Sequence, residues 1–320
     1  MASLPTIMKA VTLTALGGPE KPLFSEYKPV PRLQPGQVLI KNAYSGINFV
    51  DVYYRTGVYP SASLPTIIGQ EGAGTIVATS GPNPLGLDVG DHCPSFWSMR
   101  ATSQGHLGEG CRPVFLMGMA ATSLIQTAYS VQKRQTVLIH AAAGGVGLLL
   151  CQILRDVGAI IIGTAGGPEK CALAKENGAR HVIDYKAASS SSWVERVMEL
   201  TNGSGVDVVY DSVGKDTWEG SMDVAKRNGK VVIFGEASGP VPDIPMQKLG
   251  QKNVSMMRAA LKNMIATRPE LELYANAAFG LVKSGKVQVR IHREYSLRQV
   301  SEAHVQLEGR KTMGKLLIKL

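Results

Sequence analysis

The stretch Thr136-Val-Leu-Ile-His-Ala-Ala-Ala-Gly-Gly-Val-Gly147 decides the fold, because a short apolar run passes directly into a turn of small residues. An apolar helix from about Leu148 to Val157 is expected after the turn. Small residues between a strand and a helix let the backbone approach a diphosphate, which then binds the free N–H groups at the helix N-terminus. The stretch therefore predicts a dinucleotide-binding turn, with Gly144, Gly145 and Gly147 as its glycines.

Predicted strands and helices alternate from this turn onward. Apolar runs predict strands at 159–163, 181–185, 206–210 and 230–234. Helices are expected between them at 168–178, 193–200 and 218–225. Alternation of this kind is typical of an α/β fold with a doubly wound parallel sheet and right-handed crossovers. A glycine turn that only permits tight packing is the competing interpretation, and the alternation makes it the weaker one.

The residues on either side of this region have a different character. Residues 9–117 are rich in glycine and proline, with alternating runs that predict strands. Residues 260–320 form a stretch that is too short to fold alone, so they are expected to complete the first domain. The remaining predicted elements are strands at 9–13, 37–41, 72–77, 287–291 and 314–318, and a helix at 269–284. The expected domains are 1–117 (β-rich), 118–259 (dinucleotide-binding) and 260–320 (completing the first).

Composition excludes several classes of protein. With 320 residues, 44% hydrophobic and 18% charged, the chain is neither disordered nor short of a core. No apolar run approaches the roughly 20 residues that cross a bilayer. Four cysteines are too few for a disulfide scaffold, and the first residues lack the pattern of a signal peptide, so a cytoplasmic location is expected. The net charge of +9 suits nucleotides, RNA or acidic surfaces and does not choose among them.

The second predicted strand indicates the nucleotide. Enzymes that bind NAD usually carry an acid about 20 residues beyond the glycines, where it holds the ribose 2′-hydroxyl. No acid occurs from Ile160 to Pro168. Gly163 and Thr164 leave room for a 2′-phosphate, and Lys170 could neutralise it. The sequence therefore favours NADPH over NADH.

Several stretches spread over the chain form one recognisable set. They are 46–51 (GINFVD), 141–147 (AAAGGVG), 209–217 (VYDSVGKDT), 234–240 (FGEASGP) and 309–314 (GRKTMG). In these stretches the chain resembles the zinc-free quinone oxidoreductases of the medium-chain dehydrogenase/reductase superfamily, the group that includes zeta-crystallin. This resemblance implies a GroES-like N-terminal domain, a Rossmann domain, an active-site cleft between them and a homodimer.

The resemblance also implies roles for individual residues. It implies four catalytic residues, namely Asn48, Asp51, Tyr53 and Arg258. It places Lys170, Tyr185 and Arg310 at the 2′-phosphate. The other implied cofactor contacts are Ala141, Gly144, Gly145, Val146, Gly147, Gly163, Thr164, Ser212, Phe234 and Gly235. Glu236 departs from the family, whose members usually have asparagine there.

A metal is not expected. Related zinc alcohol dehydrogenases have Gly-His-Glu where this chain has Gly69-Gln70-Glu71, and glutamine is a poor zinc ligand. His92, Cys93, His106 and Cys111 form the one cluster of possible ligands, without a C-x2-C pair. A quinone is already electrophilic, so hydrogen-bond donors at its oxygen suffice without a Lewis acid. Tyr53, Asn48 and Arg258 are the expected donors, and the expected reaction is metal-free transfer of reducing equivalents from NADPH to a quinone.

Two other functions stay open. The first is an NADPH-dependent enone or alkenal reductase, or a trans-acting enoyl reductase of secondary metabolism. The second is an NADPH-binding protein that binds RNA with little turnover, which the positive charge permits. Scattered basic residues without an RNP-like aromatic motif make nucleic acid the less favoured partner.

Residues 92–117 depart from the family pattern. They show neither an alternating strand nor the length found in relatives, and they are shorter by roughly a dozen residues. A misplaced exon boundary or a diverged enzyme would explain this difference. We expect a missing strand in the N-terminal domain and poor turnover of quinones.

Overall fold

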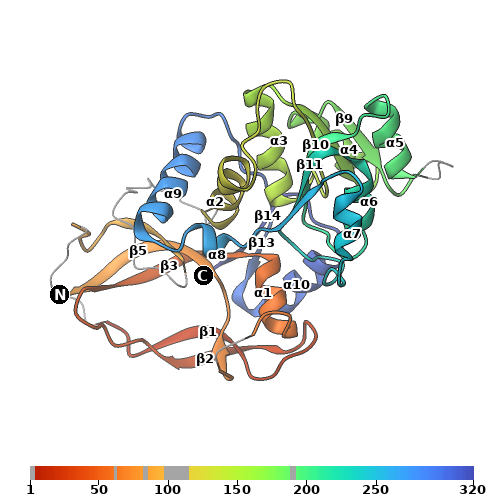
Figure 1. The fold of residues 1–320 in the computed structure, drawn as a ribbon. Helices are drawn as coiled ribbons and strands as arrows, with labels where there is room; N and C mark the ends of the chain where they lie inside the picture. Colours follow the sequence, from red (N-terminus) through yellow and green to blue (C-terminus); the bar gives the residue numbers. More distant parts are fainter. Residues whose placement is uncertain (1–3, 61–62, 82–85, 97–114, 188–191) are drawn as a thin grey trace. The chain divides into compact units, whose positions relative to one another are not determined.

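The computed structural model describes residues 4–60, 63–81, 86–96, 115–187 and 192–320. The chain divides into two compact units. Unit 1 contains residues 1–116 and 291–320, and unit 2 contains residues 117–290 (Figure 1). Residues 260–290 thus belong to unit 2, although the sequence grouped them with the C-terminal piece.

Unit 2 contains a six-stranded parallel sheet with the strand order β12-β11-β10-β7-β8-β9. Counted along the chain, this is the order 6-5-4-1-2-3 of a doubly wound dinucleotide-binding fold. The strands are β7 (Thr136–Ile139), β8 (Ile160–Ala165), β9 (His181–Asp184), β10 (Val206–Asp211), β11 (Ala225–Ile233) and β12 (Ser255–Arg258). The predicted parallel sheet is confirmed.

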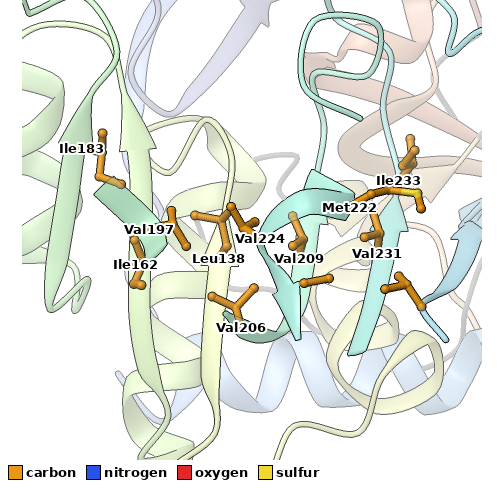
Figure 2. Packing of buried hydrophobic residues seen from close by; sticks show 12 residues of the cluster. Leu138, Ile162, Ile183, Val197, Val206, Val209, Met222, Val224, Val231 and Ile233 are labelled. Atoms are coloured by element: carbon orange, nitrogen blue, oxygen red, sulfur yellow. The ribbon is translucent and has the colours of Figure 1, made fainter. Parts of the chain in front are cut away.

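Helices connect these strands and cover the sheet. They are α3 (Gly145–Val157), α4 (Pro168–Glu176), α5 (Trp193–Leu200), α6 (Trp218–Val224), α7 (Met246–Gly250), α8 (Leu261–Met264) and α9 (Arg268–Lys283), with α2 (Phe115–Ser123) and a π-helical turn (Leu124–Ala128) before β7. Figure 2 shows Leu138, Ile162, Val209 and Val231 on neighbouring strands, with Val197 of α5 among them. Because the strands are buried, they appear in the sequence as continuous apolar runs.

Unit 1 contains two smaller sheets. One has the order β2-β1-β4 and the other β13-β14-β3-β5-β6, in which only β13 and β14 are parallel neighbours. The strands are β1 (Ile7–Leu13), β2 (Pro22–Pro29), β3 (Gln37–Ile47), β4 (Thr66–Ile67), β5 (Glu71–Ser80), β6 (His92–Phe96), β13 (Ile291–Ser296) and β14 (Lys315–Lys319). The helices are α1 (Phe49–Thr56) and α10 (Val300–Glu308), with a 3-10 turn at Leu297–Gln299. The predicted α/β class, with a β-rich domain in addition to the parallel sheet, is confirmed.

The strand predicted at 287–291 is wrong in position. The strand begins at Ile291, and Gln288 instead meets a side chain from α3. The Gln288 N–H donates to Oε1 of Gln152 at 2.7 Å, and Nε2 of Gln152 donates to the Gln288 carbonyl at 3.0 Å. One glutamine amide therefore takes both hydrogen bonds that a neighbouring strand would supply.

The expectation of a missing strand after Asp91 is also wrong in part. β6 pairs in antiparallel fashion with β5, from Thr75↔His92 to Glu71↔Phe96. Pro94 cannot donate to a ladder, but β6 is the last strand of its sheet, where a proline is tolerated. Residues 97–114 lie outside the described residues, and so do His106 and Cys111.

Candidate dinucleotide site and active site

The turn after β7 has the features of an anion site. Helix α3 begins at Gly145, and its N-cap, Gly144, provides no side-chain hydrogen bond. The first turn of the helix, which includes Val146, carries no acid. A Cβ at Gly147 would lie 2.4 Å from the carbonyl oxygen of Ala141, so only glycine fits there. Backbone N–H groups without a capping side chain suit a diphosphate, and the residues present therefore fit a dinucleotide.

The end of β8 packs closely against this turn. A Cβ at Gly163 would lie 2.8 Å from the Cβ of Ala142. The next residue, Thr164, accepts a backbone hydrogen bond from the Ala142 N–H at 3.0 Å. Its hydroxyl is buried and lies 2.9 Å from Nδ1 of His140. The hydroxyl of Thr164 is thus directed into unit 2, and its main chain supports the turn.

Two lysines lie close together beyond β8 and β9. Burial lowers the pKa of Lys170 in the first turn of α4, and the positive charge of Lys186 lowers it further. Asp184 organises the same corner, because its Oδ1 accepts from the N–H groups of Gly167 at 2.8 Å and Lys186 at 2.9 Å. Neighbouring cations of this kind suit a phosphate group.

Tyr185 lies at the same corner of unit 2. A Cβ at Gly166 would lie 2.7 Å from the Tyr185 hydroxyl, so the ring covers the backbone there. The structure therefore brings Lys170 and Tyr185 into one corner of unit 2, whereas Arg310 belongs to unit 1. Lys186 was not among the predicted site residues, although its position directly after a predicted strand could have indicated it.

Three predicted cofactor contacts, Ser212, Phe234 and Gly235, follow the carboxyl ends of β10 and β11. A Cβ at Gly235 would lie 2.7 Å from the carbonyl oxygen of Ser212, and the Phe234 N–H donates to the Asp211 carbonyl at 2.8 Å. Arg258 lies at the end of β12, where its Nη2 is 3.4 Å from Oε2 of Glu236. The family-atypical glutamate thus forms an ion pair with the predicted catalytic arginine.

Unit 1 contains a buried polar cluster at the start of α1. Nζ of Lys315 contacts Oε1 of Glu71 and lies 2.6 Å from Oδ1 of Asn48. Nδ2 of Asn48 donates to the same Glu71 oxygen at 2.9 Å, and the Leu116 N–H donates to Oε2 of Glu71 at 2.9 Å. A side chain at Gly46 would collide with both Glu71 and Lys315. The Asn48 amide is therefore held in one orientation by an ammonium and a carboxylate.

The electrostatics of Glu71 follow from this cluster. Burial alone would raise its pKa, but the charge and hydrogen bond of Lys315 and the donors Leu116 and Asn48 outweigh burial, and the pKa is lowered. Neither Glu71 nor Lys315 was among the predicted site residues. A single lysine beginning the apolar run Lys315-Leu-Leu-Ile318 is a signal, because a buried cation needs a partner.

Asp51 occupies the first turn of α1, beside the cluster. Its Oδ2 accepts from the Asn48 N–H at 2.8 Å, while Oδ1 is buried and has no hydrogen-bond partner among the described residues. Burial raises the pKa of Asp51 to about 7, although the Asn48 N–H and the charge of Lys315 act in the opposite direction. Asp51 can therefore exchange a proton near neutral pH.

Tyr53 belongs to an aromatic group that the sequence analysis did not foresee. Its ring lies 5.1 Å from that of Tyr59, centroid to centroid, and 6.3 Å from that of Phe49. The Tyr54 ring meets Tyr59 edge-on at 5.8 Å. Three of the predicted catalytic residues, Asn48, Asp51 and Tyr53, thus lie within or directly before one helix of unit 1, and Arg258 lies in unit 2.

Comparison with known proteins decides the family. A quinone oxidoreductase of Salmonella typhimurium is 39% identical over 94% of this chain and 96% of its own length. One from Pseudomonas aeruginosa is 36% identical over 97% of this chain and 99% of its own. The chain belongs to the zeta-crystallin-like quinone oxidoreductase family. Two family models match in succession, the alcohol dehydrogenase GroES-like domain at residues 34–144 and the zinc-binding dehydrogenase at 145–276.

Solved structures support the same placement in the quinone oxidoreductase family. The Escherichia coli quinone oxidoreductase complexed with NADPH matches with a TM-score of 0.87 and 34% identity, over 98% of this chain and 100% of that one. A mycobacterial protein complexed with NADPH matches with a TM-score of 0.89 and 33% identity, over 98% and 100%. Among the described residues, no helix is long and apolar enough to cross a membrane.

Proposed function

We propose that this protein is an NADPH:quinone oxidoreductase that works without a metal. The observation that carries the proposal is the pairing of an uncapped phosphate turn at α3 with the lysines at the ends of β8 and β9. Relatives of known structure that are complexed with NADPH support it.

Residues of unit 2 would hold the cofactor. The turn from Ala141 to Gly147 would bind the diphosphate, and Lys170, Tyr185 and Lys186 would bind the 2′-phosphate, with Arg310 as a further candidate from unit 1. The segments that follow β10 and β11, with Ser212, Phe234 and Gly235, would bind the nicotinamide end. When bound, NADPH supplies a hydride from nicotinamide C4.

Residues of unit 1 would act on the acceptor. A quinone that gains a hydride needs one proton to become a hydroquinone, and Asp51 is a buried carboxyl whose pKa is raised to about 7. The Asn48 amide, whose second N–H makes only a long 3.4 Å bond to the Gly46 carbonyl, and the Tyr53 hydroxyl are candidate donors to the acceptor oxygen. Hydrogen-bond donors placed where negative charge develops lower the barrier to reduction.

The proposal of a metal-free reaction rests on the residues that surround Glu71. The Lys315 ammonium occupies the side of this carboxylate that faces Asn48, and the neighbour Gln70 is a buried amide. Within the described part of the chain, no three His, Cys, Asp or Glu side chains are grouped so that they could hold a metal ion. A quinone needs no Lewis acid, since its carbonyls are conjugated and accept a hydride readily.

A direct assay tests the proposal. Purified protein is mixed with 1,2-naphthoquinone and either NADPH or NADH, and loss of the reduced nicotinamide is followed with formation of the hydroquinone. The expected result is turnover that prefers NADPH by at least tenfold in kcat/KM. Equal efficiency with both cofactors, or no turnover of any quinone, would contradict the proposal.

A second candidate function is reduction of an activated carbon–carbon double bond. A 2-haloacrylate reductase of a Burkholderia species is 32% identical over 98% of this chain and 99% of its own length. The same cofactor site would serve both reactions, since both begin with a hydride from NADPH. Turnover of an α,β-unsaturated ketone at a higher kcat/KM than 1,2-naphthoquinone would favour this function.

The proposal includes a cytoplasmic homodimer. Sedimentation or light scattering of the purified protein tests the oligomeric state. Filter binding to RNA across a salt series tests the remaining alternative, because phosphate contacts give a steep dependence on salt.

A further inference from the structure

A buried hydrogen-bonded relay crosses unit 2 beneath the phosphate turn. It runs from Asp211 through Ser221 and His140 to Thr164, and all four residues are at most 3% exposed. The Ser221 hydroxyl lies 3.0 Å from Oδ2 of Asp211 and 3.1 Å from Nε2 of His140. Nδ1 of His140 lies 2.9 Å from the Thr164 hydroxyl.

The direction of every proton in the relay follows from Asp211. Its Oδ1 accepts from the N–H groups of Val213 at 2.8 Å and Gly214 at 3.1 Å, and the Thr217 hydroxyl donates to the carboxylate as well. A carboxylate with these donors accepts the Ser221 proton, so the Ser221 oxygen must accept from His140 Nε2–H. Burial lowers the pKa of His140, which leaves Nδ1 unprotonated to accept the Thr164 hydroxyl proton.

The far end of the relay holds a strained segment of the phosphate turn. Ala141 follows His140 directly and has a φ of 51°, in the left-handed region that alanine rarely adopts. The next residue, Ala142, donates its N–H to the carbonyl of Thr164, the residue that ends the relay. The strained alanine thus lies between His140, which belongs to the relay, and Ala142, whose N–H is bound by Thr164. Strain of this kind persists only where the surroundings hold it, and it clusters at ligand sites.

We propose that Thr164 and His140 are positioning residues, whose relay to Asp211 holds the turn from Ala141 to Gly147 in the shape that binds the cofactor diphosphate. This inference rests on the proposed function. Because the diphosphate is common to NADPH and NADH, loss of the relay weakens the binding of both cofactors by the same factor. Changes at Lys170 and Lys186, by contrast, alter the ratio of the dissociation constants for NADPH and NADH.

Two substitutions at Thr164 test the inference. Thr164→Val removes the hydroxyl that donates to His140, and Thr164→Ser keeps it. Thr136→Val, at the opposite end of the neighbouring strand β7, is the matched control, because it makes the same chemical change away from the relay. Calorimetry with NADPH and NADH measures binding without turnover. Thr164→Val is expected to raise both dissociation constants about tenfold at an unchanged ratio, while Thr164→Ser and Thr136→Val stay within about threefold of the wild type.

Nitrogen-15 NMR of the histidine side chains tests the proton order directly. His140 is expected as the neutral Nε2–H form at pH 7, and Thr164→Val is expected to shift its Nδ1 resonance. A doubly protonated ring or an Nδ1–H form at pH 7 overturns the relay. Binding by Thr164→Val as tight as by Thr136→Val, or a loss for NADPH alone, overturns the positioning role while the proposed function stands. Failure of the wild type to bind either dinucleotide overturns both.

Discussion

The ammonium of Lys315 and the carboxylate of Glu71 form a buried ion pair between strands β14 and β5, with side chains 3% and 0% exposed. Asn48 bridges the two, since it accepts from Lys315 and donates to Glu71. The pair thereby connects two strands of the larger sheet in unit 1 to the start of α1. Because both charges are buried, the removal of either leaves the other without compensation.

The first prediction concerns this ion pair. Lys315→Met should lower the free energy of unfolding by about 3–5 kcal/mol, because Glu71 then stays buried without its cation. The double variant Lys315→Met/Glu71→Gln should recover most of that loss, since an uncharged amide needs no counterion. Thermal and denaturant unfolding measure both. Lys319→Met, on an exposed residue of the same strand, is the control and should change stability by less than about 0.5 kcal/mol. Additive losses in the double variant would show that the pair is not coupled.

The second prediction concerns the pH dependence of stability through Asp51. Its pKa is about 7 in the folded protein against 3.8 ordinarily, so between these pH values the folded state holds a proton that the unfolded state has lost. The free energy of unfolding should therefore fall as pH rises from about 4 to 7 and level off above, by a few kcal/mol in total. Asp51→Asn cannot ionise and should become progressively more stable than the wild type over this range.

Activity gives a separate measure of Asp51. If its carboxyl supplies the proton, the decline of kcat above about pH 7 should disappear in Asp51→Asn together with most of the turnover. Asp88→Asn, on an exposed aspartate of unit 1, should change neither profile. A stability difference between Asp51→Asn and wild type that is constant from pH 4 to 8 would show that Asp51 is ionised when folded.

Sequence patterns predicted the sheet of unit 2 well because its strands are buried on both faces and its turns use distinctive residues. The turn at Gly144 and the run Val206–Tyr210 each indicate their structure through a local pattern. The position of Ile291 could not be found in this way. The residues before it have the apolar pattern of a strand. However, the backbone of Gln288 is bound by Gln152, which is more than a hundred positions away in the chain.

The surroundings of the candidate site likewise depend on residues that are distant in the chain. Asn48, Asp51 and Tyr53 lie close in sequence, and the resemblance to the family identified them together. Their environment comes from Glu71 and Lys315, which distant strands contribute, so no local pattern could show that Asn48 is held on both sides. Likewise Thr164 was expected as a cofactor contact, and only the packing of His140 against β8 shows that its hydroxyl is directed inward.

A third prediction concerns metal. Prolonged dialysis against a strong chelator should leave quinone turnover within about twofold of the untreated protein, because the proposed chemistry uses hydrogen-bond donors and a carboxyl proton instead of a metal. Elemental analysis of the same sample should find zinc well below one atom per chain. Stoichiometric zinc whose removal abolishes activity would contradict the prediction and direct attention to His92 and Cys93.

The last prediction concerns selection of the 2′-phosphate by unit 2. Lys170→Ala and Lys186→Ala should each raise the dissociation constant for NADPH about tenfold and leave that for NADH unchanged, because only NADPH carries the phosphate these cations bind. Lys175→Ala, in the last turn of the same helix α4, removes an equal charge from an exposed position and is the control. Calorimetry with 2′,5′-ADP and 5′-AMP isolates the phosphate contact from the rest of the cofactor. If Lys186→Ala binds 2′,5′-ADP as tightly as Lys175→Ala does, Lys186 contributes only to the local charge around Lys170. If Lys170→Ala does so as well, the 2′-phosphate is held elsewhere in the chain, and Arg310→Ala becomes the decisive variant.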